Sequence, residues 1–337
     1  MAARHGSNQP PLATVTLAPA LDCTVTLSGD ITAGAVHTVA SEAVFAGGKG
    51  LNVAKLLAAH GHAVCAGGLL GASNAAPFEA LLSGHRIRDA FLRVPGETRR
   101  NEMILDGVRE CKLNRRAFPA LPYSYDLPKR IVDALVPDVG PAPALAVLSG
   151  SLPAQFPPEV YATLVRLLRE RGAAVALDTS GEALAAGIAA SPDIVKPNRE
   201  EFEALVGRAP ATEDELAAEL AELRARHGVR YAILSDGARG AYFAMPDGSV
   251  RFVAAPSVAP RDTTAAGDFL LAEFCHGLVE HDALSSTPSD DCLSGIADAA
   301  VAAGSAAVEC LGSACPDIRD IERLQSGLRV RKTWNAT

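Results

Sequence analysis

Short apolar segments alternate with amphipathic segments along most of this chain, and this alternation restricts the folds open to it. Three of the short segments are 144–148, 173–177 and 231–234, and each ends in polar or small residues. Between them, 158–171 and 213–227 have the apolar spacing of helices. Strands that alternate with helices predict an α/β fold, with a mainly parallel sheet covered by helices on both faces.

Polar and small residues gather where the predicted strands end. They occupy the segments 149–151, 178–180, 196–201 and 235–240. The carboxyl ends of parallel strands share one edge of the sheet, and ligands of such sheets bind beyond that edge. We therefore expect these four segments to converge in space and to form a binding site.

Length and charge narrow the classes of protein further. A chain of 337 residues can bury a large core, and we expect one α/β domain over 1–337 with loose termini at about 1–10 and 325–337. The net charge is −8 and no long basic run occurs, which argues against a nucleic-acid partner or a membrane-surface partner. A protein of this charge that binds anions must gather its cations locally.

Cysteine usage and hydropathy indicate the compartment. The seven cysteines are scattered without a Cys-x-x-Cys pair, so we expect reduced thiols rather than disulfides or a zinc site. No run of about 18 uninterrupted apolar residues occurs, and the N-terminus lacks the apolar core of a signal peptide. These features predict a soluble, cytoplasmic protein.

One motif suits an anion site at the start of a helix. Residues 262–268 read Asp-Thr-Thr-Ala-Ala-Gly-Asp and run directly into the apolar stretch 269–274. The first N–H groups of a helix have no partner inside it and carry partial positive charge, and small side chains let a phosphate approach them. Asp268 could then accept a proton from a hydroxyl that attacks the phosphate. The alternative is that Asp268 only caps the helix.

A second glycine-rich turn opens another predicted helix. Residues 45–57 read Phe-Ala-Gly-Gly-Lys-Gly-Leu-Asn-Val-Ala-Lys-Leu-Leu, which places a cation beside the turn and Asn52 in the first helical turn. The spacing matches neither a Walker A loop nor the dinucleotide Gly-x-Gly-x-x-Gly motif. A side chain at Asn52 could reach a bound hydroxyl.

Together these two segments resemble the two signature regions of the PfkB (ribokinase-like) sugar kinases, and the resemblance extends from about residue 13 to about 316. Five further segments match in the family's order, at 14–22, 148–153, 177–181, 195–201 and 234–241. The most similar branch is the one that phosphorylates sugar phosphates, which contains 1-phosphofructokinase and tagatose-6-phosphate kinase. The resemblance implies a ribokinase-like three-layer α/β/α fold with a small β-sheet lid.

The lid is expected in two segments that do not fit the strand–helix alternation, 29–45 and 97–118. Residues 106–109 read Asp-Gly-Val-Arg and predict a hairpin turn within the second segment. In the family such strands form a sheet over the sugar, often shared across a dimer, so the resemblance implies a homodimer formed through the lid. The alternative is a surface hairpin without a role.

The resemblance also assigns the sugar-binding residues. The segment 14–22 looks like the first strand with the substrate Asp at its end. The residues expected to bind the sugar hydroxyls are Asp22, Gly48, Lys49 and Asn52.

Arg99 is expected to bind the phosphate that the sugar already carries. In the sugar-phosphate branch the pattern Glu-Thr-Arg contains the phosphate-binding arginine, and residues 97–99 have that pattern. Neighbouring residues of a strand point to opposite faces, so Arg99 and Arg100 cannot both face the site.

ATP is expected across 198–240 and 262–268, with Mg²⁺ bridging its phosphates. The residues expected to bind ATP are Asn198, Ser235, Gly237 and Gly240. Glu201 completes an Asn-x-x-Glu pair that resembles the family's magnesium-site motif, and it would hold the ion through water. Asp268 would be the catalytic base, beside an anion hole formed by the backbone of Ala265, Ala266 and Gly267.

Three positions differ from the family pattern. Ala18 replaces an Asn, residues 115–117 replace Glu-Pro-Gly in the lid, and Ala265 replaces the first Gly of the anion-hole motif. If that position needs positive φ, a methyl group there costs on the order of 1 kcal/mol or more. Two alternatives therefore stay open: a kinase of an unphosphorylated sugar or nucleoside, and a degenerate, non-catalytic ligand-binding regulator.

Overall fold

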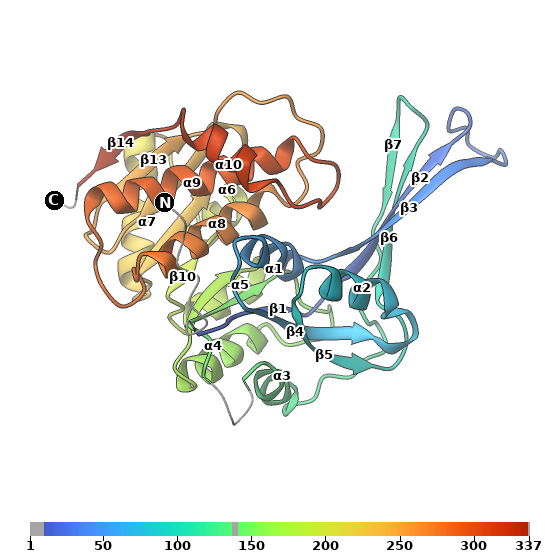
Figure 1. The fold of residues 1–337 in the computed structure, drawn as a ribbon, viewed down its shortest axis with the longest axis horizontal. Helices are drawn as coiled ribbons and strands as arrows, with labels where there is room; N and C mark the ends of the chain where they lie inside the picture. Colours follow the sequence, from blue (N-terminus) through green and yellow to red (C-terminus); the bar gives the residue numbers. More distant parts are fainter. Residues whose placement is uncertain (1–9, 137–140, 336–337) are drawn as a thin grey trace.

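The computed structural model describes residues 10–136 and 141–335, and a ten-stranded sheet forms its centre (Figure 1). In chain order its strands are β1 (Leu12–Thr16), β4 (Val64–Gly71), β5 (Arg88–Val94), β8 (Leu145–Ser149), β9 (Ala174–Asp178), β10 (Ile194–Val195), β11 (Tyr231–Ser235), β12 (Gly240–Ala244), β13 (Val250–Ala254) and β14 (Val330–Trp334). The spatial order is β14-β13-β12-β11-β10-β9-β8-β1-β4-β5. All pairs from β11 to β5 are parallel and those from β11 to β14 are antiparallel, so the predicted mainly parallel sheet is confirmed.

Helices cover both faces of this sheet and complete the three predicted layers. One face carries α1 (Lys49–Ala59), α2 (Ala76–Gly84), α8 (Ala266–Glu280), α9 (Asp290–Val308) and α10 (Ile318–Gln325). The other carries α3 (Leu127–Leu135), α4 (Val160–Glu170), α5 (Gly181–Ile188), α6 (Arg199–Val206) and α7 (Glu213–Arg226). Strand residues alternate between the two cores: Val147 packs into the first and Leu148 into the second. The helices predicted at 158–171 and 213–227 are α4 and α7.

Local sequence determines how the helices α7 and α1 begin. Thr212 caps α7, because its hydroxyl accepts a hydrogen bond from the Glu215 N–H at 3.2 Å. Gly50 lets the first turn of α1 lie directly against β1, since a Cβ at that position would lie 2.8 Å from the Val15 carbonyl oxygen. The glycine-rich turn therefore has a packing function as well as a possible binding function.

A separate four-stranded sheet forms the lid and extends away from the body (Figure 1). Its strands are β2 (Ala20–Leu27), β3 (Val39–Gly47), β6 (Arg99–Leu105) and β7 (Glu110–Leu113), in the order β3-β2-β6-β7. The expectation that 14–22 is one strand was wrong: β1 ends at Thr16, and Asp22 lies inside the lid strand β2. The chain leaves the main sheet around Pro19, where a proline cannot donate a ladder hydrogen bond.

The turn predicted at 106–109 is confirmed between β6 and β7, and a hydrogen bond links it to the β2–β3 loop at the same end of the lid. The Asp106 N–H donates to the Arg109 carbonyl at 3.3 Å. The Asp106 carboxylate also accepts from the Ile31 N–H at 2.8 Å, across from the β2–β3 loop.

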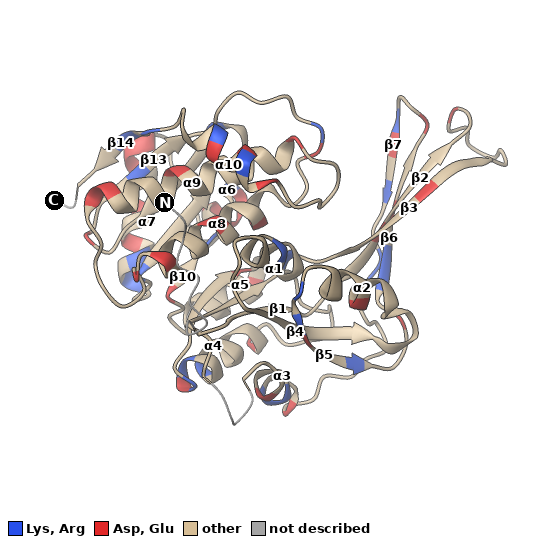
Figure 2. Cartoon of the chain, in the orientation of Figure 1, with Lys and Arg blue, Asp and Glu red and all other residues tan. Residues whose placement is uncertain are grey.

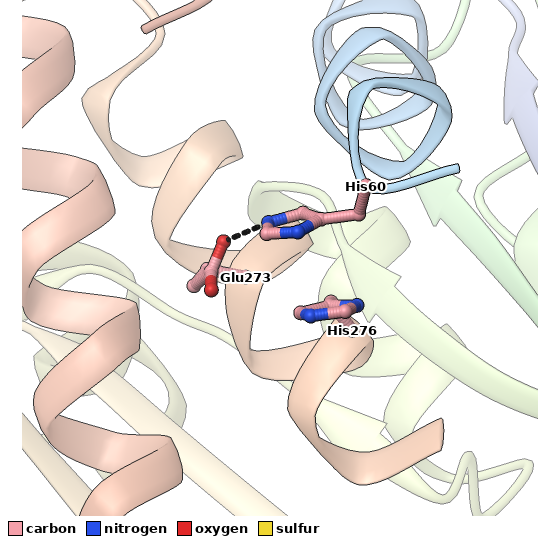
Figure 3. Close-up of side chains that lie close together, drawn as sticks. All are labelled: His60, Glu273 and His276. Carbon is pink, nitrogen blue, oxygen red and sulfur yellow. Dashed lines mark hydrogen bonds and ion pairs between the residues drawn. The ribbon is translucent and has the colours of Figure 1, made fainter. Parts of the chain in front are cut away.

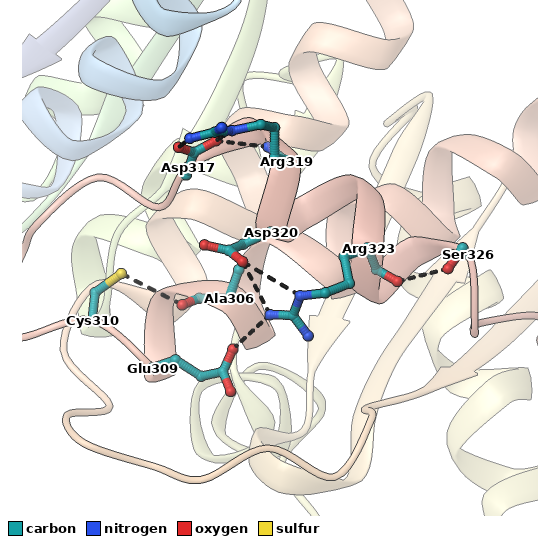
Figure 4. Close-up of polar contacts among 8 residues, drawn as sticks. All are labelled: Ala306, Glu309, Cys310, Asp317, Arg319, Asp320, Arg323 and Ser326. Carbon is teal, nitrogen blue, oxygen red and sulfur yellow. Dashed lines mark hydrogen bonds and ion pairs between the residues drawn. The ribbon is translucent and has the colours of Figure 1, made fainter.

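The C-terminal segment corrects another expectation. Residues 325–337 are not all loose, because β14 pairs with β13 and extends the main sheet. The helix α10 precedes β14 in the chain, and Figure 4 shows its polar contacts. The Arg323 guanidinium donates to Glu309 and to Asp320, each at 3.2 Å. Residues 1–9 and 336–337, at the two expected loose ends, lie outside the described residues.

Charged side chains of both signs are spread over the described residues. Figure 2 shows Lys and Arg interspersed with Asp and Glu. The helix α9 is long and apolar enough to cross a membrane by length and composition, and 67% of its 18-residue apolar window is buried inside the structure. All seven cysteines are free thiols.

Candidate active site

Asp268 lies at the centre of the site, in the first turn of α8. Its carboxylate is buried and accepts a hydrogen bond from the Asn52 side-chain amide at 2.8 Å. It makes no capping hydrogen bond, and the N-cap position belongs to Ala265. The alternative that Asp268 only caps the helix is therefore excluded.

Polar and charged groups from three strand ends and from the start of α1 lie around this carboxylate. Asp178 ends β9, and its carboxylate oxygen Oδ1 lies 3.2 Å from Nζ of Lys196 and 3.5 Å from Nζ of Lys49. Its other oxygen accepts from the Ser149 hydroxyl at 3.2 Å, at the end of β8. The polar segments that follow neighbouring parallel strands thus converge as predicted.

These surroundings shift the two carboxyl groups in opposite directions. Burial, together with the nearby Asp178 charge, raises the pKa of Asp268 to about 6, although Lys49 and Asn52 lower it. Burial also acts to raise the pKa of Asp178, but the Lys196 and Lys49 ammonium groups outweigh it and hold that pKa below its ordinary value. The site therefore pairs a carboxyl group whose pKa is held low, that of Asp178, with one whose pKa is raised toward neutral pH, that of Asp268.

The turn before α8 has the backbone shape expected of an anion hole. Ala265 has φ 64° and ψ 1°, in the left-handed region that favours glycine. Its carbonyl accepts from the Asp268 N–H at 3.0 Å, so that N–H is already bonded. Lys196 lies at the same turn, because a Cβ at Gly267 would come 3.3 Å from its Nζ. A backbone turn, a helix N-terminus and an ammonium group thus meet at one point.

A cavity of about 740 Å³ opens beside this turn. It is lined by all four residues expected to bind ATP, Asn198, Ser235, Gly237 and Gly240, and by Ala266 and Gly267 of the anion hole. Its apolar wall comes from Val258, Leu270, Val301 and Val308. This combination of an apolar wall with a few polar groups is typical of ligand sites.

Asn198 and Glu201 have a structural function that the sequence did not distinguish from metal binding. The Asn198 side chain accepts from the Glu201 N–H at 2.8 Å, and the Glu201 carboxylate accepts from the Asn198 N–H at 2.9 Å. This is a capping box at the start of α6. It fixes both side chains at the start of α6, where Asn198 lines the cavity, and the metal role of Glu201 stays a prediction.

Asp22 is the sugar-binding residue expected from the lid, and it lies on the lid strand β2. Its carboxylate accepts from the Asn101 amide at 3.0 Å, and burial raises its pKa. Gly47 lies opposite Ala20 on the neighbouring strand, and a Cβ there would come 2.3 Å from the Asp22 carboxylate. The absence of a side chain at Gly47 therefore leaves room for the Asp22 carboxylate in its present position.

The two lid arginines have different surroundings. Arg99 is half-buried and donates to the Ala18 carbonyl at 3.0 Å, in electrostatic contact with Asp22. Arg100 is also partly exposed, and its guanidinium donates at 2.7 Å to Glu42 on the lid strand β3, across β2. Arg99 thus lies on the Asp22 face of the lid, in agreement with the expected strand facing.

The pfkB family carbohydrate kinase profile matches residues 18–319. The chain belongs to this family. Two curated relatives are both 1-phosphofructokinases: that of Rhodobacter capsulatus is 42% identical over 79% of this chain and 83% of its own length, and that of Escherichia coli K12 is 34% identical over 82% and 86%.

Solved structures of other members confirm the fold of this pfkB kinase. Phosphofructokinase-2 from Escherichia coli in complex with potassium has a TM-score of 0.82 at 24% identity, covering 94% of this chain and 99% of that one. Ribokinase from Arabidopsis thaliana, complexed with ribose and ATP, has a TM-score of 0.69 at 21% identity, covering 94% and 99%. The three-layer, ribokinase-like fold is thus established.

Three polar residues of this pfkB site were missed as site residues in the sequence. Asp178 and Lys196 were noted only as members of polar strand ends, and nothing in their spacing shows that they form an ion pair. Asn101 could have been found, because it lies two residues after Arg99 on the same face of a predicted strand. The cavity wall from α9 has no local signal, since its residues belong to an ordinary apolar helix.

Proposed function

We propose that this chain transfers the γ-phosphoryl group of ATP to a hydroxyl of a ketohexose phosphate, giving a bisphosphate. The observation that supports this most is the Asp268 carboxylate, buried at the N-terminus of α8 between the large cavity and the lid side, with a pKa of about 6. A base with that pKa is ionised at neutral pH and strong enough to accept a proton from an attacking hydroxyl.

ATP would occupy the cavity of about 740 Å³, with its adenine against the apolar wall and its phosphates toward α8. The N–H groups of Ala266 and Gly267 and the Lys196 ammonium would stabilise the charge on the transferring phosphoryl group. Because Lys196 is buried and fixed by Asp178, it can act there without reorganisation.

The acceptor would lie between Asp268 and the lid. Asp22, Gly48, Lys49 and Asn52 would orient its hydroxyls, and Asn52 would also keep the Asp268 carboxylate aligned. Arg99 would bind the existing phosphate. Among the described residues, its guanidinium donates to the backbone carbonyls of Ala18, Pro19 and Arg115, and an anionic phosphate makes stronger hydrogen bonds than a neutral carbonyl.

Among the ketohexose phosphates, fructose 1-phosphate is favoured over tagatose 6-phosphate and fructose 6-phosphate. The relatives at 34–42% identity carry the name 1-phosphofructokinase. The structure of phosphofructokinase-2 from Escherichia coli in complex with fructose-6-phosphate is only 24% identical in sequence to this chain, so it supports the fold alone.

The donors at this site fit Mg²⁺ held by one carboxylate together with substrate phosphates and water. Among the described residues, no cluster of three possible metal ligands borders the nucleotide cavity, and Glu201 is the carboxylate expected there. Mg²⁺ is commonly bound by one or two carboxylates together with substrate phosphates and water. Glu201 would hold the ion through water, and the ion would neutralise charge on the phosphates.

The lid would exclude water from the reaction and would join two subunits into a homodimer. Val44 and Leu113 are 41% and 45% exposed and lie on the lid face opposite Asp22, where a second copy could cover them. We expect the enzyme to act in the cytoplasm.

The proposal is tested by ATP turnover with a panel of acceptors: the three ketohexose phosphates, free fructose, ribose and adenosine. We expect the highest kcat/KM with fructose 1-phosphate. A preference for an unphosphorylated sugar or nucleoside would contradict the phosphate specificity. If none of the acceptors supports ATP turnover, the result would favour a regulator that only binds ligand.

A further inference from the structure

A cluster of histidines lies away from the active site, where the C-terminal end of α1 meets the middle of α8 (Figure 3). We call His60, His62, Glu273 and His276 the histidine cluster. His60 directly follows α1, His62 is two residues further, and the other two belong to α8. None of the four has a role in the proposed phosphoryl transfer.

Three of these side chains have the types and spacing of metal ligands. One ligand atom from each of His60, Glu273 and His276 lies within 4.8 Å of the other two. Nε2 of His60 is 2.7 Å from the Glu273 carboxylate. Glu273 and His276 are three residues apart on one helix, which places both on the same face.

The fourth member is placed to orient one of these ligands. Nε2 of His62 lies 2.8 Å from Nδ1 of His276. A metal-bound histidine usually uses its second ring nitrogen for such a hydrogen bond, which fixes its tautomer and ring orientation. With Nδ1 bonded to His62, the Nε2 atom of His276 is the one that would bind an ion.

From this geometry we propose that the histidine cluster binds a divalent transition-metal ion of the zinc class. Two imidazoles and a carboxylate are a ligand set that Zn²⁺ accepts, with a fourth position left for water. A cavity of about 380 Å³ beside the cluster has room for that water. The Glu273 side chain is only 7% exposed, and a carboxylate buried to that extent needs a positive partner.

Binding requires two small movements. The His60 and His276 rings are stacked, with centroids 3.7 Å apart and planes 11° apart, so one ring must turn before both nitrogens point at one ion. Ligands about 2.0–2.2 Å from a tetrahedral ion are about 3.3 Å apart, so the His60–Glu273 pair must also open slightly. Both are side-chain rotations of residues that line the cavity of about 380 Å³.

A metal here would join the same two helices that form the active site. Asn52 of α1 and Asp268 of α8 are bonded near the helix N-termini, whereas the histidine cluster joins α1 and α8 about two turns later. An ion bound only by the folded protein would stabilise it by mass action. The alternative is that His60 and Glu273 form only a hydrogen bond between the two helices, without any metal.

The test uses the purified full-length protein after treatment with a chelator. Zn²⁺ is titrated by calorimetry and its effect on the thermal unfolding midpoint is recorded. We expect one equivalent of Zn²⁺ bound with micromolar or tighter affinity and a higher midpoint. His276→Gln should weaken binding about tenfold or more, whereas His227→Gln, at a histidine after α7, should leave it unchanged.

Co²⁺ gives an independent measurement of the ligands. Bound by nitrogen and oxygen atoms, Co²⁺ should show visible d–d bands without the near-ultraviolet charge-transfer band that a thiolate gives. If His276→Gln does not fold, Glu273→Gln provides the same comparison. The proposal is overturned by equal Zn²⁺ affinity in these variants, by a thiolate band, or by the absence of tight stoichiometric binding to the wild type.

Discussion

At the scale of single residues, Asp268 carries a charge that its surroundings disfavour. Its folded-state pKa of about 6 lies above the ordinary value of 3.8, mainly because of burial. A raised pKa favours the protonated form in the folded protein, so the stability linked to this group is present below about pH 4 and is lost as the pH rises through about 6. The active site is therefore maintained at a cost in stability at neutral pH.

Asp268→Asn should consequently be more stable than the wild type at pH 7.5, by about 1–3 kcal/mol. The asparagine keeps an acceptor for Asn52 but removes the buried charge. Chemical denaturation at pH 7.5 and at pH 4 measures the effect. The gain should shrink strongly at pH 4, where Asp268 is protonated in the wild type, and an equal gain at both pH values would refute the charge explanation.

Asn52→Leu should move the acid limb of the kcat/KM profile to higher pH. The hydrogen bond from Asn52 lowers the pKa of Asp268, so removing it raises that pKa further above about 6. The profile with saturating ATP measures the shift, whatever the loss in absolute rate. A limb that does not move, or moves to lower pH, would mean that Asp268 is not the titrating base.

Ala265→Gly should stabilise the protein by about 0.5–1 kcal/mol. With φ 64°, the alanine sits in a conformation that costs about 1–2 kcal/mol for a residue with a Cβ, and this strain exceeds the extra unfolded-state entropy of glycine. The rate of phosphoryl transfer should rise several-fold if the methyl group also holds the turn away from the phosphate.

Ala266→Gly is the matched control, because that residue is the first of α8 and needs no positive φ. It should destabilise the protein in the same denaturation experiment. If both glycine variants lose stability, the turn before α8 is not strained.

At the scale of elements, the lid strand β6 directs Arg99 and Arg100 to opposite faces of the lid sheet. Arg99→Ala should raise KM for the sugar phosphate about 10- to 150-fold, as expected for loss of a charged hydrogen bond of roughly 1.5–3 kcal/mol, with little change in KM for ATP. Arg100→Ala is the control, since it removes only an exposed ion pair with Glu42. The reverse result would place the phosphate on the other face of the lid.

Sequence patterns predicted the elements well where their signal is local. The strand at 144–148 is β8, and the helices α4 and α7 begin and end within two residues of their predicted limits. The turn before α8 and Asp268 could be singled out together because a short motif carries both, and their roles as anion hole and base stay predictions. The lid strand β2 was merged with β1, although Leu21, Cys23 and Val25 alternate as a half-buried strand should.

Long-range pairing explains the remaining errors. The strand β14 has no strong apolar pattern and is a strand only because β13 lies beside it. The ion pairs of Asp178 with Lys49 and Lys196, and the histidine cluster, join residues far apart in the chain. No local spacing predicts such contacts, because they depend on how the sheet and helices pack.

At the scale of the whole molecule, the proposed assembly depends on Val44 and Leu113, two exposed apolar residues on the lid face opposite Asp22. Substituting both Val44 and Leu113 with Asp should convert a homodimer to monomers, because two charges would be buried at the interface. Sedimentation velocity measures the change. Leu311→Asp is the control, at an exposed leucine outside the lid, and should leave the dimer intact. A dimer that survives the lid substitutions would place the interface elsewhere.

The central claim is that Asp268 is the base of a kinase acting on a ketohexose phosphate. The most direct test compares the wild type with Asp268→Asn in single-turnover formation of fructose 1,6-bisphosphate from fructose 1-phosphate and ATP. We predict rapid formation by the wild type, and a rate lower by roughly a hundredfold or more in the variant with ATP affinity retained. A variant that forms the bisphosphate at nearly the wild-type rate would contradict the account.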